Sequence, residues 1–238
     1  MKIMITGASG FIGSSIVKKF ENDNDIFKLK IRNLGDIKKS ESAILNYAPD
    51  VFIHCGWWGG SAFCDSNSKG QLRNIVIGKR LFDVLGKLKN LNFVGLGSFA
   101  EYGKYNIPIR EDFLETPNNL YGLCKKVFKD FSKCACEDNN FNWLWIRPCF
   151  VYGPNDRSNR FIPRIISACR SSNSNEKFNS CNSVMDYLYI DDFVEALRIL
   201  IKDKKSGVFN ICSGNQYKAK YLIDLIKDLS NSTVDFSF

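Results

Sequence analysis

The sequence predicts an α/β protein built around a doubly wound, parallel β-sheet. Short apolar runs alternate along the chain with longer segments whose apolar residues recur at helical spacing. The run Val51-Phe52-Ile53 shows no alternation with polar residues, which is typical of a strand buried on both faces. A glycine-rich turn at 7–13 joins the first predicted strand to the first predicted helix. Strands that alternate with helices in this way indicate a parallel sheet covered by helices on both sides.

The elements of the first part of the chain follow from these patterns. Residues 2–6 form an apolar strand that ends at Gly7, and residues 11–20 form the first helix. The elements expected next are a strand at 26–31, a short helix at 42–47, a strand at 51–54, a helix at 72–85, a strand at 91–96, a helix at 121–136 and a strand at 142–146.

The pattern changes after Arg147-Pro148. We expect a turn at 153–155, a helix at 161–169, an exposed polar loop at 171–183, a strand at 187–190, a helix capped by Asp192, a strand at 208–212 and a final helix around 221–229. Residues 1–150, continued by parts of 185–212, are therefore expected to form one domain. Residues 151–238 are expected to form most of a small second lobe.

Composition excludes several classes of protein. The 238 residues carry a net charge of +8, but the basic residues are scattered, so we expect no nucleic-acid partner. Nine Cys and one His, without metal-ligand spacing, indicate neither a disulfide framework nor a metal site. No apolar run approaches the about 18 to 20 residues of a membrane span, and no signal-peptide core precedes the first strand. We therefore expect a cytoplasmic protein without a membrane partner.

The glycine turn indicates a dinucleotide site. Glycines at this spacing after a first strand allow a tight turn, a close approach of backbone to a pyrophosphate and close packing of helix on strand. The sheet is therefore predicted to be Rossmann-type. The cofactor-binding residues expected in this turn are Gly7, Ser9, Gly10, Phe11, Ile12 and Gly13.

The end of the second predicted strand bears on the choice of cofactor. Sites for NAD usually place Asp or Glu about 20 residues after the glycines, to bind the ribose hydroxyls. Arg32 stands in that neighbourhood, and a guanidinium pairs with a 2′-phosphate. We therefore predict NADP(H) as the preferred cofactor. NAD(H) is the alternative, with Arg32 as a solvated surface residue.

Three residues form a candidate catalytic group. Tyr121 and Lys125 stand four apart at the start of a predicted helix, so both project from one face. A free tyrosine has a pKa of about 10, and a nearby ammonium favours its phenolate. Ser98 follows the strand at 91–96, at the sheet edge where ligands of doubly wound folds lie. Tyr121 would then exchange a proton with a carbonyl or alcohol oxygen that Ser98 holds.

These residues lie in motifs that resemble the NAD-dependent epimerase/dehydratase family of extended short-chain dehydrogenases/reductases, which act on nucleotide sugars. The matching segments run in order over nearly the whole chain, at 6–13, 35–37, 49–54, 97–103, 121–125, 147–154, 186–192 and 209–214. The resemblance implies that Ser98 and Tyr121 act on the sugar and that Lys125 holds the nicotinamide ribose.

The resemblance also implies further site residues and partners. Asp36 and Ile37 would lie near the adenine, and Cys55 and Gly56 along the cofactor cleft. The substrate-binding residues implied are Ser98, Ala100, Tyr121 and Arg160, the last in a segment that helps to close over the nucleotide. Dimers through two long helices are common in the family, so a homodimer is expected.

Departures from the family pattern narrow the reaction. Dehydratases of the family carry an Asp-Glu pair directly after the hydroxyl residue, where this chain has Phe99 and Ala100, and fucose-type epimerase-reductases carry Cys at position 100. The remaining candidates are reduction of a 4-keto-6-deoxy nucleotide sugar for surface-polysaccharide synthesis and 4-epimerisation. Arg32 favours the reductase, and residues 152–166 resemble the CDP-abequose and paratose synthase branch.

Two further departures from the family pattern suggest an alternative function that is not catalytic. Met185 stands where the family usually has an Arg that contacts the diphosphate. The chain ends at Phe238, whereas relatives continue for several tens of residues that complete the substrate lobe. We therefore expect a C-terminally short, incomplete lobe. The alternative function is a catalytically degenerate NADP-binding module.

Overall fold

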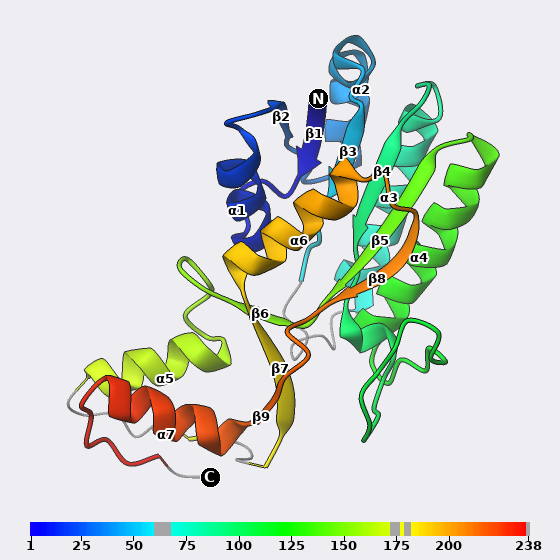
Figure 1. The fold of residues 1–238 in the computed structure, drawn as a ribbon. Coiled ribbons are helices and arrows are strands. Elements are labelled where there is room, and N and C mark those ends of the chain that lie inside the picture. Colours follow the sequence, from blue (N-terminus) through cyan, green and yellow to red (C-terminus); the bar gives the residue numbers. More distant parts are fainter. Residues whose placement is uncertain (60–67, 172–176, 179–181, 237–238) are drawn as a thin grey trace. The chain divides into compact units, whose positions relative to one another are not determined.

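The computed structural model describes residues 1–59, 68–171, 177–178 and 182–236 (Figure 1). The chain divides into two compact units. The first comprises Met1–Pro148 and Val194–Ile211, and the second comprises Cys149–Phe193 and Cys212–Phe238.

The elements alternate between strands and helices through most of the chain. In order they are β1 (Lys2–Thr6), α1 (Phe11–Phe20), β2 (Asp25–Leu29), α2 (Leu34–Tyr47), β3 (Val51–His54), α3 (Ser68–Leu85), β4 (Asn92–Leu96), the 3₁₀ helix η1 (Phe99–Glu101), α4 (Leu120–Asp138), β5 (Asn142–Pro148), β6 (Phe150–Tyr152), α5 (Phe161–Arg170), β7 (Val184–Tyr189), α6 (Ile190–Lys202), β8 (Gly207–Ile211), β9 (Gln216–Lys218) and α7 (Ala219–Leu229).

A six-stranded parallel sheet forms the centre of the first unit. Its strand order is β2-β1-β3-β4-β5-β8, with Ile3 of β1 paired to Ile26 of β2 on one side and to Val51 of β3 on the other. The order reverses between β1 and β3, which is the switch point where doubly wound sheets bind ligands beyond the carboxyl ends of their strands. The predicted Rossmann-type α/β class is therefore confirmed.

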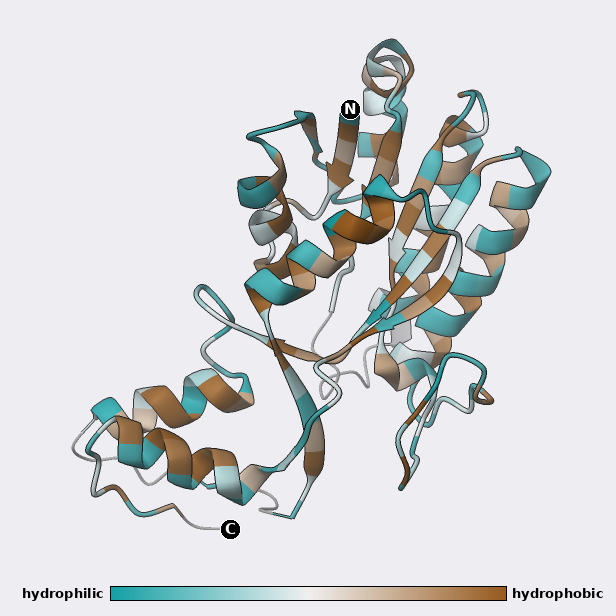
Figure 2. Ribbon diagram, in the orientation of Figure 1, coloured by the Kyte–Doolittle hydropathy of each residue, from teal (hydrophilic) through white to brown (hydrophobic). Residues whose placement is uncertain are grey.

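Helices cover both faces of this sheet (Figure 1). Helices α2, α3 and α4 pack side by side on one face, where Met4, Phe52 and Phe93 of the strands meet Phe82 of α3 and Phe128 of α4. Brown, hydrophobic stretches mark the central strands β1, β3 and β4 in Figure 2, as expected for strands buried on both faces of a sheet. No helix in the described part of the chain is both long and apolar enough to cross a membrane.

The second unit has its own small sheet and core. Strand β6 pairs in parallel with β7, and β7 pairs antiparallel with β9. Helices α5 and α7 pack together around Ile165, Phe178 and Ile223.

Several element boundaries differ from the predictions. Helix α2 begins at Leu34 rather than near 42, because the side chains of Asn33 and Asp36 form a capping box around its first turn. Strand β7 begins at Val184, and α6 begins at Ile190, before the predicted cap at Asp192. The short strands β6 and β9 were not predicted. Part of the predicted loop at 171–183 lies outside the described residues.

Candidate active site

The glycine turn between β1 and α1 is closed by backbone packed against backbone. Gly7 has a φ of +71°, and a Cβ atom on it would lie 2.6 Å from the main-chain nitrogen of Gly56. A Cβ atom on Gly13 would lie 2.1 Å from the main-chain oxygen of Gly7. Gly10 donates its N–H to that same oxygen at 2.9 Å. The turn therefore requires glycine at positions 7 and 13, and the predicted cofactor residues Gly7, Gly13 and Gly56 lie together.

The first turn of α1 presents its main-chain N–H groups without a side-chain cap. Gly10 is the N-cap residue, and the hydroxyls of Ser14 and Ser15 donate back to the oxygen of Phe11. Ser9 and Gly10 are exposed, while Phe11 and Ile12 are half-buried. An exposed helix N-terminus next to a close glycine turn fits the pyrophosphate of a dinucleotide. The residues present thus fit a dinucleotide, without a choice between NAD(H) and NADP(H).

A buried polar group supports the turn from behind. The Thr6 hydroxyl accepts the N–H of Gly56 at 3.1 Å and lies 2.9 Å from Nδ1 of His54. Burial, reinforced by the charge of Lys125, lowers the pKa of His54 to about 3, so the imidazole is neutral. Burial also raises the pKa of Cys55 to about 12, so its thiol stays protonated. His54 and Cys55 thus act as structural neighbours of the turn.

Two arginine residues, Arg32 and Arg73, meet near the end of β2. Arg32 is exposed, and its main-chain oxygen accepts a hydrogen bond from Nη2 of Arg73 on α3 at 2.5 Å. The Asp36 carboxylate accepts the main-chain N–H groups of Arg32 and Asn33, and the first of these bonds is the main reason why its pKa is lowered. Ile37 is buried in the core, so its predicted cofactor contact would have to come from its backbone.

Ser98 begins a tight turn at the end of β4. Its hydroxyl accepts the N–H of Ala100 at 3.2 Å, and its own N–H donates to Oε1 of Glu101 at 2.7 Å. A Cβ atom on Gly97 would lie 2.4 Å from that same Oε1 atom. The Glu101 carboxylate therefore lies directly beneath the turn and fixes the backbone of Ser98.

A buried network of charges continues from Glu101. Arg147 on β5 donates Nε to Glu101 at 2.8 Å and Nη1 to the Tyr102 hydroxyl at 2.5 Å. Its Nη2 bonds Glu115, which also accepts from Lys129 of α4. Burial raises the pKa of Glu101, while its pairing with Arg147 acts in the opposite direction. The network joins the Ser98 turn, β5 and α4 by side chains that are almost fully buried.

Tyr121 and Lys125 occupy the first turns of α4, which is capped by Asn119. The Lys125 side chain is only 4% exposed, and its Nζ atom donates to the main-chain oxygen of Leu96 at 2.6 Å. Nζ lies 3.9 Å from the ring centroid of Trp57 and 5.9 Å from that of Tyr121. Burial lowers the pKa of Lys125 to about 7, although Glu101 and Cys55 act in the opposite direction.

Close backbone packing brings the start of α4 to the Ser98 turn. A Cβ atom on Gly122 would lie 2.2 Å from the main-chain oxygen of Ala100, so only a glycine fits there. The structure thus gathers the Ser98 turn, Tyr121 and Lys125 beyond the carboxyl end of β4. Their roles in catalysis stay predictions.

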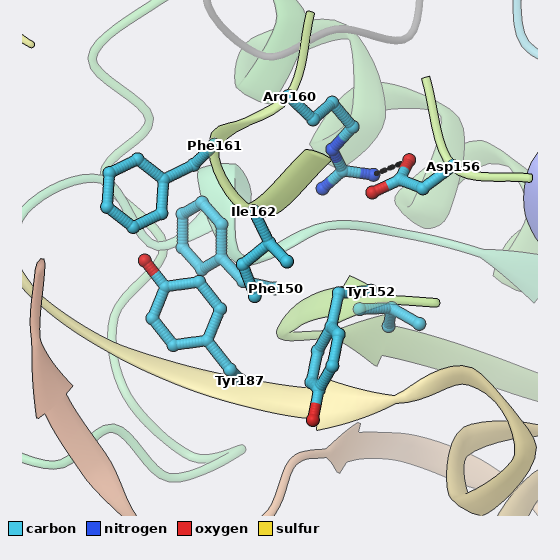
Figure 3. A pocket seen from close by; sticks show the side chains of 8 residues that line it. Phe150, Tyr152, Asp156, Arg160, Phe161, Ile162 and Tyr187 are labelled. Atoms are coloured by element: carbon cyan, nitrogen blue, oxygen red, sulfur yellow. Dashed lines mark ion pairs between the residues drawn. The ribbon is translucent and has the colours of Figure 1, made fainter. Parts of the chain in front are cut away.

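Arg160 belongs to the second unit and lines a small, open hollow there (Figure 3). Phe150, Phe161 and Tyr187 supply aromatic rings to it, with the Phe161 and Tyr187 rings stacked at 6.2 Å. Asp156, whose side chain is 2% exposed, pairs with Arg160 at 3.5 Å. Burial raises the pKa of Asp156. Met185 lies in β7, paired with Tyr217 of β9.

Sequence reasoning missed two neighbours of the candidate site, Glu101 and Arg73, and for Trp57, which it placed beside the cleft, it missed the contact with Lys125. Glu101 gave no signal because a carboxylate after a strand is common on surfaces, whereas here it is fully buried. Arg73 lies far from Arg32 in the sequence, so no spacing rule joins them. Trp57 follows β3 in the sequence, and it contacts Lys125 of α4 only because the folded chain brings the two residues together. Among the described residues, no group of three or more His, Cys, Asp or Glu is arranged to hold a metal ion.

Comparison with known proteins gives a family match over most of the chain. The model of the NAD-dependent epimerase/dehydratase family matches residues 3–212. The dTDP-6-deoxy-L-talose 4-dehydrogenase (NAD(+)) of Aggregatibacter actinomycetemcomitans is 25% identical over 238 residues, covering 90% of this chain and 85% of that protein. CDP-abequose synthase of Salmonella muenchen is 23% identical over 256 residues, covering 100% of this chain and 83% of that protein.

Solved structures share the fold. UDP-glucose 4-epimerase of Thermus thermophilus, in complex with NAD, has a TM-score of 0.88 at 17% identity, covering 100% of this chain and 86% of that one. RMD from Pseudomonas aeruginosa, complexed with NADPH, has a TM-score of 0.88 at 20% identity, covering 99% and 84%. These two neighbours hold different nicotinamide cofactors, so the fold alone does not choose between them.

Proposed function

Because the chain belongs to the NAD-dependent epimerase/dehydratase family, we propose that it reduces the 4-keto group of a nucleotide-bound 4-keto-6-deoxy sugar. Family membership confirms the resemblance found in the sequence and places the chain among nucleotide-sugar enzymes. The observation that carries the proposed reaction is the Ser98 turn next to Tyr121 and Lys125, with no carboxylate at positions 99 and 100. The names of two relatives, a 6-deoxy-talose 4-dehydrogenase and CDP-abequose synthase, support it.

The proton chemistry is assigned to three side chains. Tyr121 donates a proton to the C4 oxygen in reduction and takes it back in oxidation. Ser98 donates its hydroxyl hydrogen to the same oxygen, while the Ser98 oxygen accepts from the N–H of Ala100. The positive charge of Lys125 favours the phenolate of Tyr121. When bound, the nicotinamide supplies the hydride.

The environment of Glu101 argues against dehydration. Besides the tyrosine, removal of water from a sugar needs a further acid–base group, such as a carboxylate, that reaches the substrate. Glu101 is the carboxylate of the turn, and its oxygens bond Ser98 N–H, Arg147 and Trp145 with the side chain fully buried. Glu101 therefore holds the turn and does not reach the substrate.

NADP(H) is the preferred cofactor in this proposal. Arg32 and Arg73 place two guanidinium-bearing residues at the end of β2, where the ribose of a dinucleotide lies in this fold class. A 2′-phosphate is the group that two such cations bind well. NAD(H) stays the alternative. A cytoplasmic location is also part of the proposal.

The second unit is proposed to bind the nucleotide part of the substrate. Aromatic side chains in its hollow suit a planar base, and the Arg160 guanidinium suits a phosphate. Arg160→Ala should then raise KM for the nucleotide sugar more than it lowers kcat. Equal affinity for the substrate in this variant would contradict the assignment.

A homodimer through α3 and α4 completes the proposal. These two packed helices carry four apolar side chains that are 41% to 54% exposed: Leu72, Val76, Leu123 and Val127. A second copy of the chain would cover them. Light scattering should give a dimer mass that falls to the monomer mass in Leu123→Glu/Val127→Glu. The control Ile199→Glu on α6 should stay dimeric, and a wild-type monomer would contradict the proposal.

The deciding experiment supplies the purified chain with NADPH and a panel of 4-keto-6-deoxy nucleotide sugars, alongside mass spectrometry of any cofactor that copurifies. Oxidation of NADPH coupled to a 4-hydroxy product supports the reductase. Copurified NAD with 4-epimeric products would replace it by an epimerase. Tight cofactor binding without turnover of any sugar would indicate a degenerate module.

A further inference from the structure

Trp57 is held in one orientation beside the candidate catalytic residues. Its Nε1 atom donates to Oε1 of the buried Gln71 at 2.9 Å. Its ring meets Tyr121 edge-on, with centroids 6.4 Å apart and planes at 89°, and it also packs against Phe128 at 5.9 Å. The face of the indole lies over the Nζ atom of Lys125, 3.9 Å from the ring centroid.

Lys125 carries its charge in an unusual setting. In the described part of the chain it forms no ion pair with a carboxylate, although it is 4% exposed. The titratable groups that act on it are Glu101, Cys55 and His54, besides Tyr121 on its own helix. Glu101 is bonded to Arg147, His54 is neutral and the Cys55 thiol is protonated. Its two close partners are therefore the Leu96 oxygen and the Trp57 ring.

We propose that Trp57 is a positioning residue that keeps Lys125 protonated and held beside Tyr121 through a cation–π contact. The π face of an indole attracts an ammonium but stabilises a neutral amine very little. The contact therefore favours the charged form of Lys125. A carboxylate in the same place would also favour the ammonium, but its negative charge would oppose the phenolate of Tyr121. An aromatic face holds the cation without cancelling its field. The inference rests on the proposed function only in the roles of Tyr121 and Lys125.

The contact matters because burial already works against the charge. With the pKa of Lys125 near 7, a modest loss of stabilisation changes how much of the ammonium is present at neutral pH. Removal of the aromatic face should therefore move the Lys125 titration midpoint down by about one pH unit.

The test measures that midpoint directly, in the chain without cofactor or substrate. The ¹³Cε resonance of Lys125 is assigned by its loss in Lys125→Met and followed with pH in wild type, Trp57→Phe, Trp57→Leu and Trp58→Leu. Leu keeps an apolar cover over the ammonium but has no π face. Trp57→Leu should lower the midpoint most and Trp57→Phe less. Trp58→Leu is the matched control, because the neighbouring indole packs on Gly70, and it should leave the midpoint unchanged.

A second test keeps the size of the indole ring and applies if the Trp57→Leu variant fails to fold. Biosynthetic fluorination of tryptophan withdraws charge from the ring face with little change in volume, so the midpoint should fall stepwise with the number of fluorines. The same labelling in Trp57→Phe should have no effect. An unchanged or raised midpoint in Trp57→Leu, or no response to fluorination, would overturn the proposal. Neither outcome bears on the nucleotide-sugar assay, so the two proposals fail independently.

Discussion

The Nζ atom of Lys125 lies 2.6 Å from the main-chain oxygen of Leu96, the last residue of β4. This bond joins the helix that carries Tyr121 to the strand that leads into Ser98. It also places an ammonium in a buried site, which lowers the pKa of Lys125 to about 7. A buried group with such a pKa links the stability of the fold to pH.

The sign of that linkage follows from proton binding. The unfolded chain keeps the Lys125 proton up to its ordinary pKa of 10.5, whereas the folded chain loses it near 7. Between these values the unfolded state binds more protons, so this group makes the free energy of unfolding rise with pH. At pH values below the pKa of Lys125 in the folded chain, Lys125 is charged, and the cost of burying this charge lowers the free energy of unfolding in full.

Lys125→Met should remove this dependence. Relative to the variant, wild type should gain about 3 kcal/mol of unfolding free energy between about pH 6 and about pH 9. Urea unfolding of both proteins at several pH values measures the difference, which cancels groups common to both. Parallel pH curves would show that Lys125 keeps an ordinary pKa.

The glycine turn allows a contrast between two neighbouring glycines. In Gly13→Ala the new Cβ atom meets the Gly7 oxygen at 2.1 Å, so the backbone of the turn must shift. In Gly10→Ala the same oxygen is 3.3 Å away, and a small adjustment suffices. Urea unfolding should therefore show a large loss of stability for Gly13→Ala and a small loss for Gly10→Ala. Calorimetric titration with NADPH should show weakened binding for both, because the new Cβ atom of Gly10→Ala stands where the backbone approaches the pyrophosphate. Undiminished binding by Gly10→Ala would mean that the turn does not form the site.

Strands β1, β3, β4 and β5 were predictable because buried parallel strands have few polar residues and the helices between them have a clear period. The start of α2 was not, because Gly35-Asp36 favours a turn by composition and becomes helical only through the cap formed with Asn33. The contact of Trp57 with Lys125 could not be predicted from the sequence either. It joins a loop after β3 to a helix after β4, and only the parallel order of these strands brings the two together.

Arg32 and Arg73 should act together on cofactor preference. Loss of either guanidinium removes a partner for a 2′-phosphate, so Arg32→Ala and Arg73→Ala should each raise KM for NADPH far more than KM for NADH. Arg80→Ala is the control, because Arg80 lies on the same helix but pairs with Asp83. Initial-rate kinetics with both cofactors decide the matter. Equal effects on the two KM values would return Arg32 to the role of a surface residue.

Glu101 should contribute more to the free energy of unfolding than an exposed ion pair does. Glu101→Gln still accepts the N–H of Ser98 but removes one of the two carboxylates that pair with the buried Arg147 and leaves only Glu115. Breaking a buried ion pair typically costs about 3 to 5 kcal/mol. Asp112→Asn breaks the exposed pair with Arg110 and should change the stability far less, because water screens this pair. Urea unfolding measures both. A small effect of Glu101→Gln would mean that the other bonds of Arg147 compensate its charge.

Tyr121→Phe gives the sharpest separation of chemistry from binding. The ring stays, so its edge-on contact with Trp57 and the packing of α4 are preserved, and only the proton-bearing oxygen is lost. General acid–base catalysis contributes about 10² to 10⁴ in rate, so kcat for the 4-keto sugar should fall by that factor while the affinity for NADPH stays within about twofold. Tyr105→Phe, which removes a hydroxyl that bonds the Leu114 oxygen in an exposed loop, is the matched control. If Tyr121→Phe keeps most of its turnover while binding NADPH normally, then Tyr121 is not the proton donor and a different group must reach the C4 oxygen.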